Sequence, residues 1–139
     1  CFQELEKVGT DDPTREAEIA FQKGSEGMPA LMESLGAMTA AEFDEGVGIL
    51  NDCTDISFEA GGQQVPGTMG ELSIEKVGDQ SAAWRMTFDI DGVPLTFEFS
   101  ATRVGNIGVL VGVADLGGVE EGLLDTMTAK AVAKISPTA

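Results

Sequence analysis

The stretch WRMTFDIDGVPLTFEFSATRVGNIGVLVGV, residues 84–113, decides the fold because apolar and polar residues alternate on both sides of two glycine-containing turns. A period of two is typical of half-buried strands. The dipeptide Asp91-Gly92 between two such runs predicts a two-residue hairpin turn of type I′, in which both turn residues take positive φ. The stretch therefore predicts antiparallel strands.

A two-residue turn also fixes which residues lie opposite each other. It places Met86 opposite Phe97 on one face and Arg85 opposite Glu98 on the other. Opposite charges directly across two strands attract each other by roughly 0.2–1 kcal/mol, so this register is favourable. Its remaining pairs are Trp84–Phe99, Phe88–Leu95 and Thr87–Thr96.

The acidic residues of the turn also suggest a calcium loop, but the spacing is wrong. A loop of the EF-hand type needs Gly at its sixth position and Glu at its twelfth. Counted from Asp89, the glycine is the fourth residue and the twelfth is Ser100. We therefore expect a turn here and no metal site.

A second turn at Gly105-Asn106 predicts that Phe99 lies opposite Gly112, where the small residues of the third strand leave room for neighbouring aromatic rings. The other face of the sheet then mixes valines with polar groups, which is the usual composition of a binding surface. The alternative is that a helix covers this face. The candidate binding residues are Arg85, Thr87, Thr96, Glu98, Val109 and Val111.

The first third of the chain predicts helices. Asp11-Asp12-Pro13 is a helix-start signal, since Asp caps helices and Pro suits the first helical position. Thr39 and Glu42 have the spacing of a capping box. We expect three helices: from Pro13 to before Gly24, from Pro29 to Ala37, and from the Thr39 cap through Leu50.

The remaining segments complete an α+β pattern. Alternation over residues 56–60 predicts a strand, residues 72–76 predict another, and residues 119–135 predict an amphipathic helix. Residues 1–139 thus form one domain with N-terminal helices, an antiparallel meander sheet of about five strands, and a C-terminal amphipathic helix.

Composition excludes several classes of partner. The 139 residues carry 24 Asp and Glu against 8 Lys and Arg, a net charge of −16. Such a surface repels nucleic acid phosphates and anionic lipid headgroups. The longest apolar run, residues 107–114, is far shorter than the about 20 residues of a spanning helix. We expect neither a nucleic acid partner nor a membrane span.

Residues suited to catalysis are scarce. The chain has no His and no Tyr, which removes the commonest general base and the histidine-based metal sites. Its acidic pairs, such as Asp44-Glu45, diverge on helices or at caps. We therefore expect a protein that is not an enzyme and that has no catalytic residues, no metal and no cofactor.

The segment from residue 77 to residue 113, with its terminal helix, resembles the extracellular sensor domain of actinobacterial receptor-type Ser/Thr kinases (the PknH-like group) and related stand-alone lipoproteins. The matching features are Gly78-Asp79 before a Trp-bearing strand, Arg103-Val104-Gly105-Asn106 before an apolar strand, and Cys53 where helices give way to sheet. The resemblance covers residues 50–135. It implies an extracytoplasmic, non-enzymatic domain with a cleft of mixed polarity, whereas the low number of cysteines departs from the family.

We accordingly expect a ligand-sensing or ligand-binding domain outside the cytoplasm, secreted or membrane-anchored, whose partner is an unidentified small ligand or an envelope protein. Two alternatives stay open: an envelope protein–protein interaction module and a secreted hydrolase that uses carboxylates. The chain begins at Cys1 without a methionine, so we expect that it has been trimmed. Cys1 and Cys53 form a disulfide in this interpretation, with free thiols or a lipid anchor at Cys1 as the alternatives.

Overall fold

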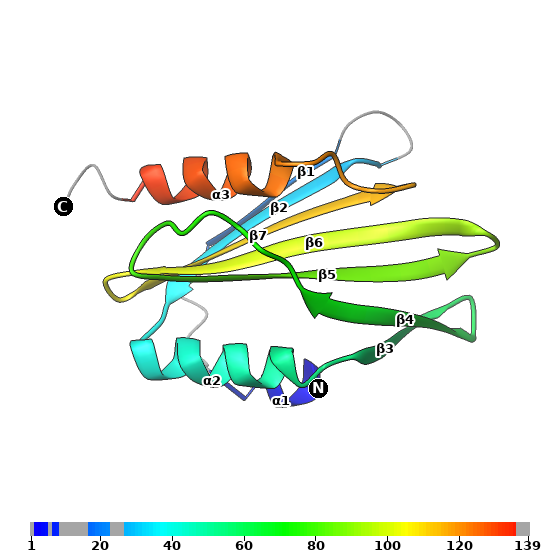
Figure 1. Cartoon of the computed structure of the whole chain (residues 1–139), viewed down its shortest axis with the longest axis horizontal. Helices are drawn as coiled ribbons and strands as arrows, with labels where there is room; N and C mark the ends of the chain where they lie inside the picture. The colour runs from blue at the N-terminus through cyan, green and yellow to red at the C-terminus, as the bar shows by residue number, and fades with distance from the viewer. Residues whose placement is uncertain (1, 6, 9–16, 23–26, 136–139) are drawn as a thin grey trace.

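A computed structural model describes residues 2–5, 7–8, 17–22 and 27–135 of the chain. Its middle layer is a seven-stranded antiparallel sheet in the order β1-β2-β7-β6-β5-β4-β3, with α3 (Leu123–Ala133) on one face and α2 (Ala40–Asn51) on the other (Figure 1). The predicted α+β class is confirmed, with seven strands in place of about five. The strands are β1 (Ala17–Gln22), β2 (Ala30–Ala37), β3 (Asp55–Ala60), β4 (Gln63–Glu71), β5 (Gln80–Ile90), β6 (Val93–Val104) and β7 (Ile107–Leu116).

The hairpin of β5 and β6 has the predicted turn and register. Asp91 and Gly92 have φ values of 53° and 84°, which is the positive-φ pair of a type I′ turn. Met86 lies opposite Phe97 and Arg85 lies opposite Glu98, as expected. The second hairpin is also confirmed, since Phe99 pairs with Gly112 and Gly105 takes positive φ.

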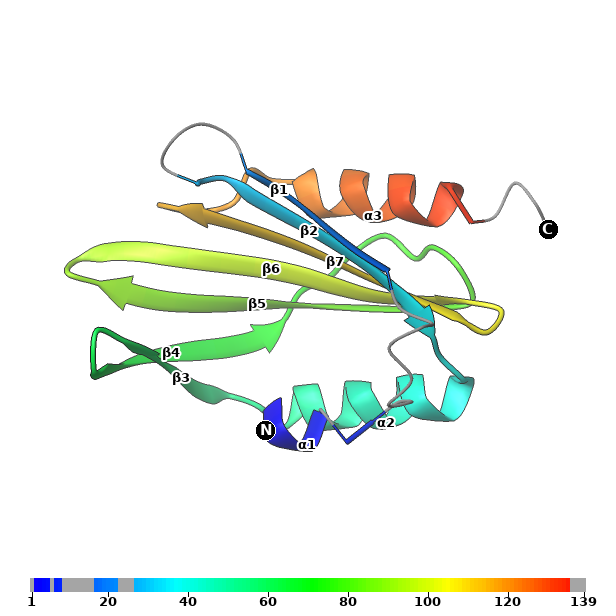
Figure 2. The same cartoon turned by 180° about the vertical axis from the view of Figure 1, so that it is seen from behind.

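The helix predicted from Pro29 to Ala37 is wrong, because these residues form strand β2. Its sequence, ALMESLGA, contains no β-branched residue and several good helix formers, so local propensity favours a helix. Pairing with β7 on one side and β1 on the other overrides that preference (Figure 2). Alternation then sends Leu31 and Leu35 toward α3 and Met32 toward the other face.

The first predicted helix falls partly on β1, an edge strand, and its start signal at Asp11-Asp12-Pro13 lies outside the described residues. The prediction of a helix is therefore wrong over Ala17–Gln22. A short helix, α1 (Phe2–Leu5), lies N-terminal to this segment.

The strand predicted over residues 72–76 is also wrong, since β4 ends at Glu71. Pro66 is accommodated in β4 because it pairs with β3 before the pairing with β5 begins at Gly67.

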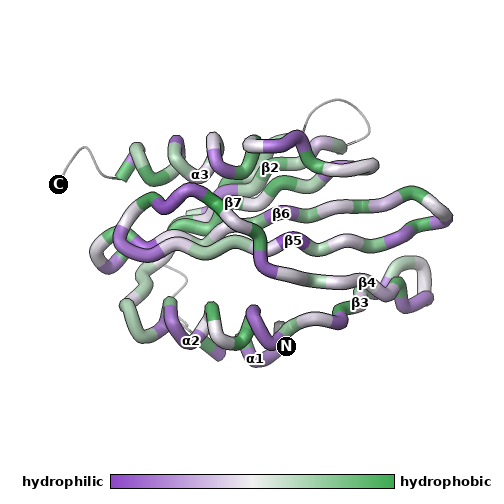
Figure 3. Tube along the Cα trace, in the orientation of Figure 1, coloured by the Kyte–Doolittle hydropathy of each residue, from purple (hydrophilic) through white to green (hydrophobic). Residues whose placement is uncertain are grey.

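Both long helices sit where the sequence places them, with hydrophilic and hydrophobic segments alternating along each (Figure 3). At the start of α2 the Thr39 side chain accepts a hydrogen bond from the Glu42 amide, and Glu42 accepts one from the Thr39 amide. This reciprocal pair is the predicted capping box. The helix predicted over residues 119–135 is confirmed over the narrower range of α3 (Leu123–Ala133), whose inner residues include Leu124 and Ala131.

Each face of the sheet has its own apolar core. On the α2 face, Phe43 and Leu50 of the helix pack with Trp84, Phe88 and other side chains of β3 to β6. On the α3 face, Val109, Val111 and Val113 pack with Leu124 and Ala131. The sheet therefore separates two clusters that differ in the size of their side chains.

Candidate ligand-binding pocket

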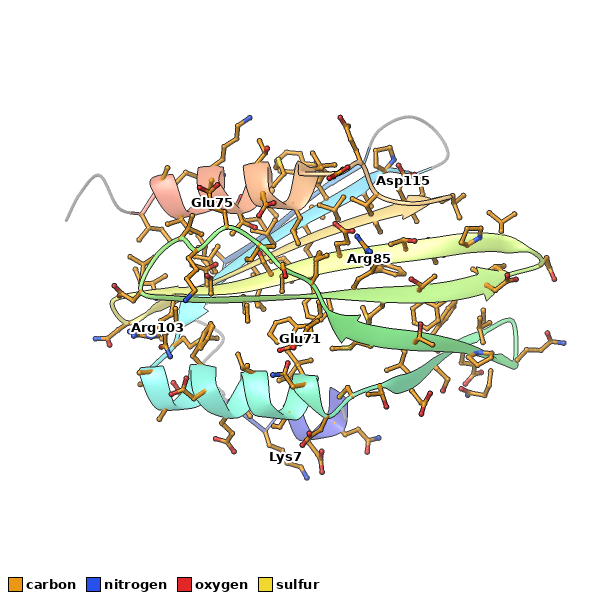
Figure 4. The ribbon with its side chains drawn as sticks, viewed as in Figure 1. Lys7, Glu71, Glu75, Arg85, Arg103 and Asp115 are labelled. Carbon is orange, nitrogen blue, oxygen red and sulfur yellow. The ribbon has the colours of Figure 1, made fainter. Side chains whose placement is uncertain are left out.

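The polar residues predicted to bind a ligand do come together on the α3 face. Arg85 donates from Nε and Nη2 to Oε1 of Glu98 at 2.9 and 2.6 Å, and Thr87 pairs with Thr96 across the strands. The Arg85 side chain is 52% exposed whereas that of Glu98 is 7% exposed. Arg85, which Figure 4 places on the α3 side of the sheet, is thus held by a nearly buried carboxylate.

The two valines of the predicted site are not accessible from this face. Val109 and Val111 are buried in the cluster under α3, where Leu124 and Ala131 cover them. The alternative in the sequence interpretation, a helix covering this face, describes the structure at these positions. A ligand on the α3 side would reach the exposed Arg85 and the half-buried Thr87, but neither the valines nor Thr96, which is 7% exposed.

A pocket of about 710 Å³ lies on the opposite face, between α2 and strands β2, β7, β6 and β5. Its floor is the aromatic face of the hairpin, and Phe43, Val47 and Leu50 of α2 form one wall. Glu98 and Val111 border it from within their strands, although their side chains point to the α3 side. Other apolar lining residues are Leu5, Met32, Met38, Trp84, Met86, Phe97, Phe99 and Leu110.

The floor is shaped by two glycines of β7. A Cβ on Gly112 would lie 3.6 Å from the end of Met32, and one on Gly108 would lie 2.9 Å from Met38. Gly108 therefore allows Met38 to pack directly on the sheet. Because Gly112 has no side chain, the pocket is deeper at that position. Three of the six methionines, Met32, Met38 and Met86, line this space. Such side chains adapt to ligands of different shape because they are unbranched and polarizable.

The aromatic part of the floor is fixed in place. Trp84 is 1% exposed, stacks on Phe99 at a centroid distance of 5.3 Å, and donates from Nε1 to Oδ1 of Asn51 at 2.9 Å. A buried indole with its N–H satisfied is held in one orientation. Trp84 is accordingly a core residue, as the sequence indicated, and it ties the end of α2 to the sheet.

The N-terminal part of α2 is also tied to the sheet, by polar contacts. Gln80 donates to Asp44 of the helix at 2.7 Å, and Arg103 donates to Gln80. Asp79 accepts from the Gly105 amide at 2.7 Å, and its own amide donates to the Arg103 carbonyl. The Gly78-Asp79 and Arg103–Asn106 motifs therefore meet at one end of the sheet, where Figure 4 shows Arg103 beside α2.

The polar content of the pocket is small. Glu42 and Ser34 are among its few polar lining residues, and within the residues that the structure describes no Lys or Arg lines it. The two hydrogen bonds from Thr39 lower the pKa of Glu42 below its ordinary value, the bond from the backbone amide more than that from the hydroxyl. The pocket is thus apolar with one ionised carboxylate at the wall.

Sequence reasoning missed most of this pocket, although one signal pointed to it. Gly108, Gly112 and Ala114 were expected to leave room above β7, and part of that room is the pocket. Met32 and Ser34 were missed because their segment was predicted to be a helix. Val8 and Leu5 reach the pocket from the N-terminal residues, which carry no periodic pattern.

Three further expectations concern a metal site, a membrane span and a disulfide. Within the described part of the chain, no group of three or more His, Cys, Asp or Glu side chains is arranged to hold a metal. No helix among those residues is long and apolar enough to cross a membrane. Cys53 is buried after the end of α2, and its predicted partner Cys1 lies outside the described residues, so the disulfide stays a prediction.

No protein-family model and no curated protein matches the chain. Among solved structures, it is similar to the crystal structure of the extracellular domain of PknH from Mycobacterium tuberculosis, with a TM-score of 0.65 and 12% sequence identity. The match covers 83% of this chain, which spans 60% of the length of that one. This likeness agrees with the sequence resemblance in pointing to a related fold, and at this identity it concerns the fold alone.

Proposed function

We propose that the protein is a non-enzymatic, extracytoplasmic domain that binds a small apolar ligand in the pocket between α2 and the sheet. The observation that carries the proposal is the pocket of about 710 Å³ lined by aromatic, methionine and aliphatic side chains. Small-molecule sites have volumes of roughly 300–1,000 Å³ and are lined mainly by such residues.

The setting of the pocket supports binding over catalysis. Its described lining has no His, Cys, Lys or Arg, and its one ionised wall residue is engaged in a capping box. An acid–base mechanism needs a group whose pKa lies near the working pH, whereas the pKa of Glu42 is lowered. Apolar side chains on a rigid sheet favour burial of a hydrophobic molecule.

The extracytoplasmic location rests on two arguments. The fold is similar to that of the extracellular domain of PknH. A Cys1–Cys53 disulfide would persist only in an oxidising compartment. The polar group of Arg85, Thr87 and the buried Thr96 remains a proposed second contact site for a ligand or an envelope protein on the α3 side, with Arg85 as its exposed member.

A neutral fluorescent probe tests the proposal. N-phenyl-1-naphthylamine should show a saturable rise in fluorescence with the protein, because its emission increases in an apolar site. Gly112→Leu places a side chain on the pocket floor and should weaken binding by about tenfold, which corresponds to about 1.4 kcal/mol.

Gly70→Leu is the matched control. This glycine also lies in a strand, an added Cβ there meets nothing within 4 Å, and it does not line the pocket. The Gly70→Leu variant should bind the probe as the wild type does. The absence of saturable binding to the wild type, or equal binding by folded Gly112→Leu and Gly70→Leu variants, would contradict the proposed function.

A further inference from the structure

The charges around the pocket are of one sign. Glu42 stands in the α2 wall, and within the described residues no cationic side chain lines the space. Glu98 also borders it, but Arg85 neutralises that carboxylate on the other face. Lys7 follows α1 and points away from the sheet, whereas Glu71 of β4 projects to the α2 side (Figure 4).

Glu42 is held in its ionised form and in a fixed position. Its Oε2 accepts from the amide and the hydroxyl of Thr39 at 2.7 and 2.8 Å, which leaves Oε1 outside the capping box. The N-terminus of α2 contributes the equivalent of about half a positive charge, which offsets part of the carboxylate but not all of it. A net negative charge therefore remains at this wall.

The whole molecule adds to this local field. A net charge of −16 on 139 residues produces a negative potential that attracts cations and repels anions before they reach the surface. Salt screens this contribution, since the Debye length is about 10 Å at 0.1 M ionic strength. Glu42 is itself partly exposed to solvent, so salt also weakens its attraction for a charge on the ligand.

We propose, on the basis of the proposed function, that the pocket selects amphiphiles by charge. It takes an apolar chain that carries a cationic head, with the chain on the aromatic and methionine floor and the head beside Glu42. It rejects the same chain carrying an anionic head, because no described lining residue compensates an anion. Free fatty acids and anionic phospholipids are thus excluded as ligands.

Two surfactants with the same chain test this selection. Decyltrimethylammonium and decyl sulfate, each below its critical micelle concentration, compete with bound N-phenyl-1-naphthylamine at low salt. We expect the cationic compound to displace the neutral probe at a much lower concentration. Equal displacement by both, or preferential displacement by decyl sulfate, would overturn the inference.

Charge-neutralising variants separate the local contact from the overall field. Glu42→Gln and Glu45→Gln each remove one negative charge from α2, but only Glu42 lines the pocket. Glutamine also suits the capping box, so the helix start is kept. Glu42→Gln should weaken decyltrimethylammonium binding by about fivefold, the size of the attraction between unit charges about 4 Å apart in water, and Glu45→Gln should not.

The outcomes distinguish this inference from the proposed function. Equal weakening in both variants would mean that the overall charge, and not Glu42, selects the ligand, and would overturn the assigned position of the head. Failure of the neutral probe to bind the wild type would instead refute the pocket as a binding site. The Gly112→Leu variant checks that surfactant displacement takes place in the pocket.

Discussion

The two faces of one sheet are covered by helices in different ways. Under α3 the sheet presents Val109, Val111 and Val113, and a buried hydroxyl pair, Ser100 and Thr128, at 2.7 Å joins sheet and helix. Under α2 it presents rings and methionines, and a pocket of about 710 Å³ remains between helix and strands. Small branched residues let a helix approach and close a face, whereas large ones together with glycines leave space.

The comparison assigns separate roles to the two faces. The α3 face provides stability, because its side chains are buried and its polar groups are mostly paired. The α2 face is the one that we propose for binding, and Leu110 on its floor is 40% exposed. Asp44 and Asn51 hydrogen-bond α2 to the sheet, and Phe43, Val47 and Leu50 of the helix line the space that remains between them.

The largest expected effect concerns the predicted disulfide beside the α2 face. Closing the loop from Cys1 to Cys53 should stabilise the fold by about 4 kcal/mol in the chain-entropy model. Reduction should lower the free energy of unfolding by that amount in urea titrations, with loss of hydrogen-exchange protection in α2 before α3. Two thiols that react with an alkylating agent in the unreduced, denatured protein, seen by intact mass, would refute the bridge.

The second prediction compares a truncation on each face. Leu124→Ala removes a side chain that is 2% exposed under α3 and should cost about 3 kcal/mol of stability. Leu110→Ala removes a half-exposed side chain from the pocket floor and should cost less than about 1 kcal/mol. Urea unfolding of both variants provides the measurement. Equal costs would show that the two faces are packed alike.

A smaller effect is expected from the hydroxyls of the α3 face. Thr102 is fully buried, and its Oγ1 makes no hydrogen bond to any residue that the structure describes. Thr102→Val keeps the shape and removes this group, so stability should rise by about 1 kcal/mol. Ser100→Ala should lower it by about 1 kcal/mol, because Thr128 loses its partner. A destabilised Thr102→Val variant would indicate a partner for that hydroxyl.

The sequence predicted those parts of the fold whose signals are local. Asp91-Gly92 and Gly105-Asn106 set the two registers because turn chemistry fixes strand pairing over short distances. The Thr39–Glu42 capping box located α2 for the same reason. The strand β2 was not predictable in this way, since its partner β7 lies far along the chain and its residues favour helix.

The candidate site was predicted less well, for a related reason. The polar cluster of Arg85, Thr87, Thr96 and Glu98 follows from the hairpin register and is confirmed as a spatial group. Long-range packing decides which face of the sheet α3 covers. The helix covers the face on which Val109 and Val111 were expected to bind a ligand. Residues of β2 line the pocket, so the pocket could not be predicted from a sequence interpretation in which that segment is a helix.

The methionine methyl groups test the comparison of the two faces most directly. Met32, Met38 and Met86 line the pocket, and Met127 packs in the α3 cluster. The protein is labelled with 13C at its methionine methyl groups and titrated with N-phenyl-1-naphthylamine. The NMR signals of the three pocket methionines should shift and show contacts to the probe, while the Met127 signal stays in place. Shifts confined to Met127, or none at the three pocket methionines on saturation, would contradict the account.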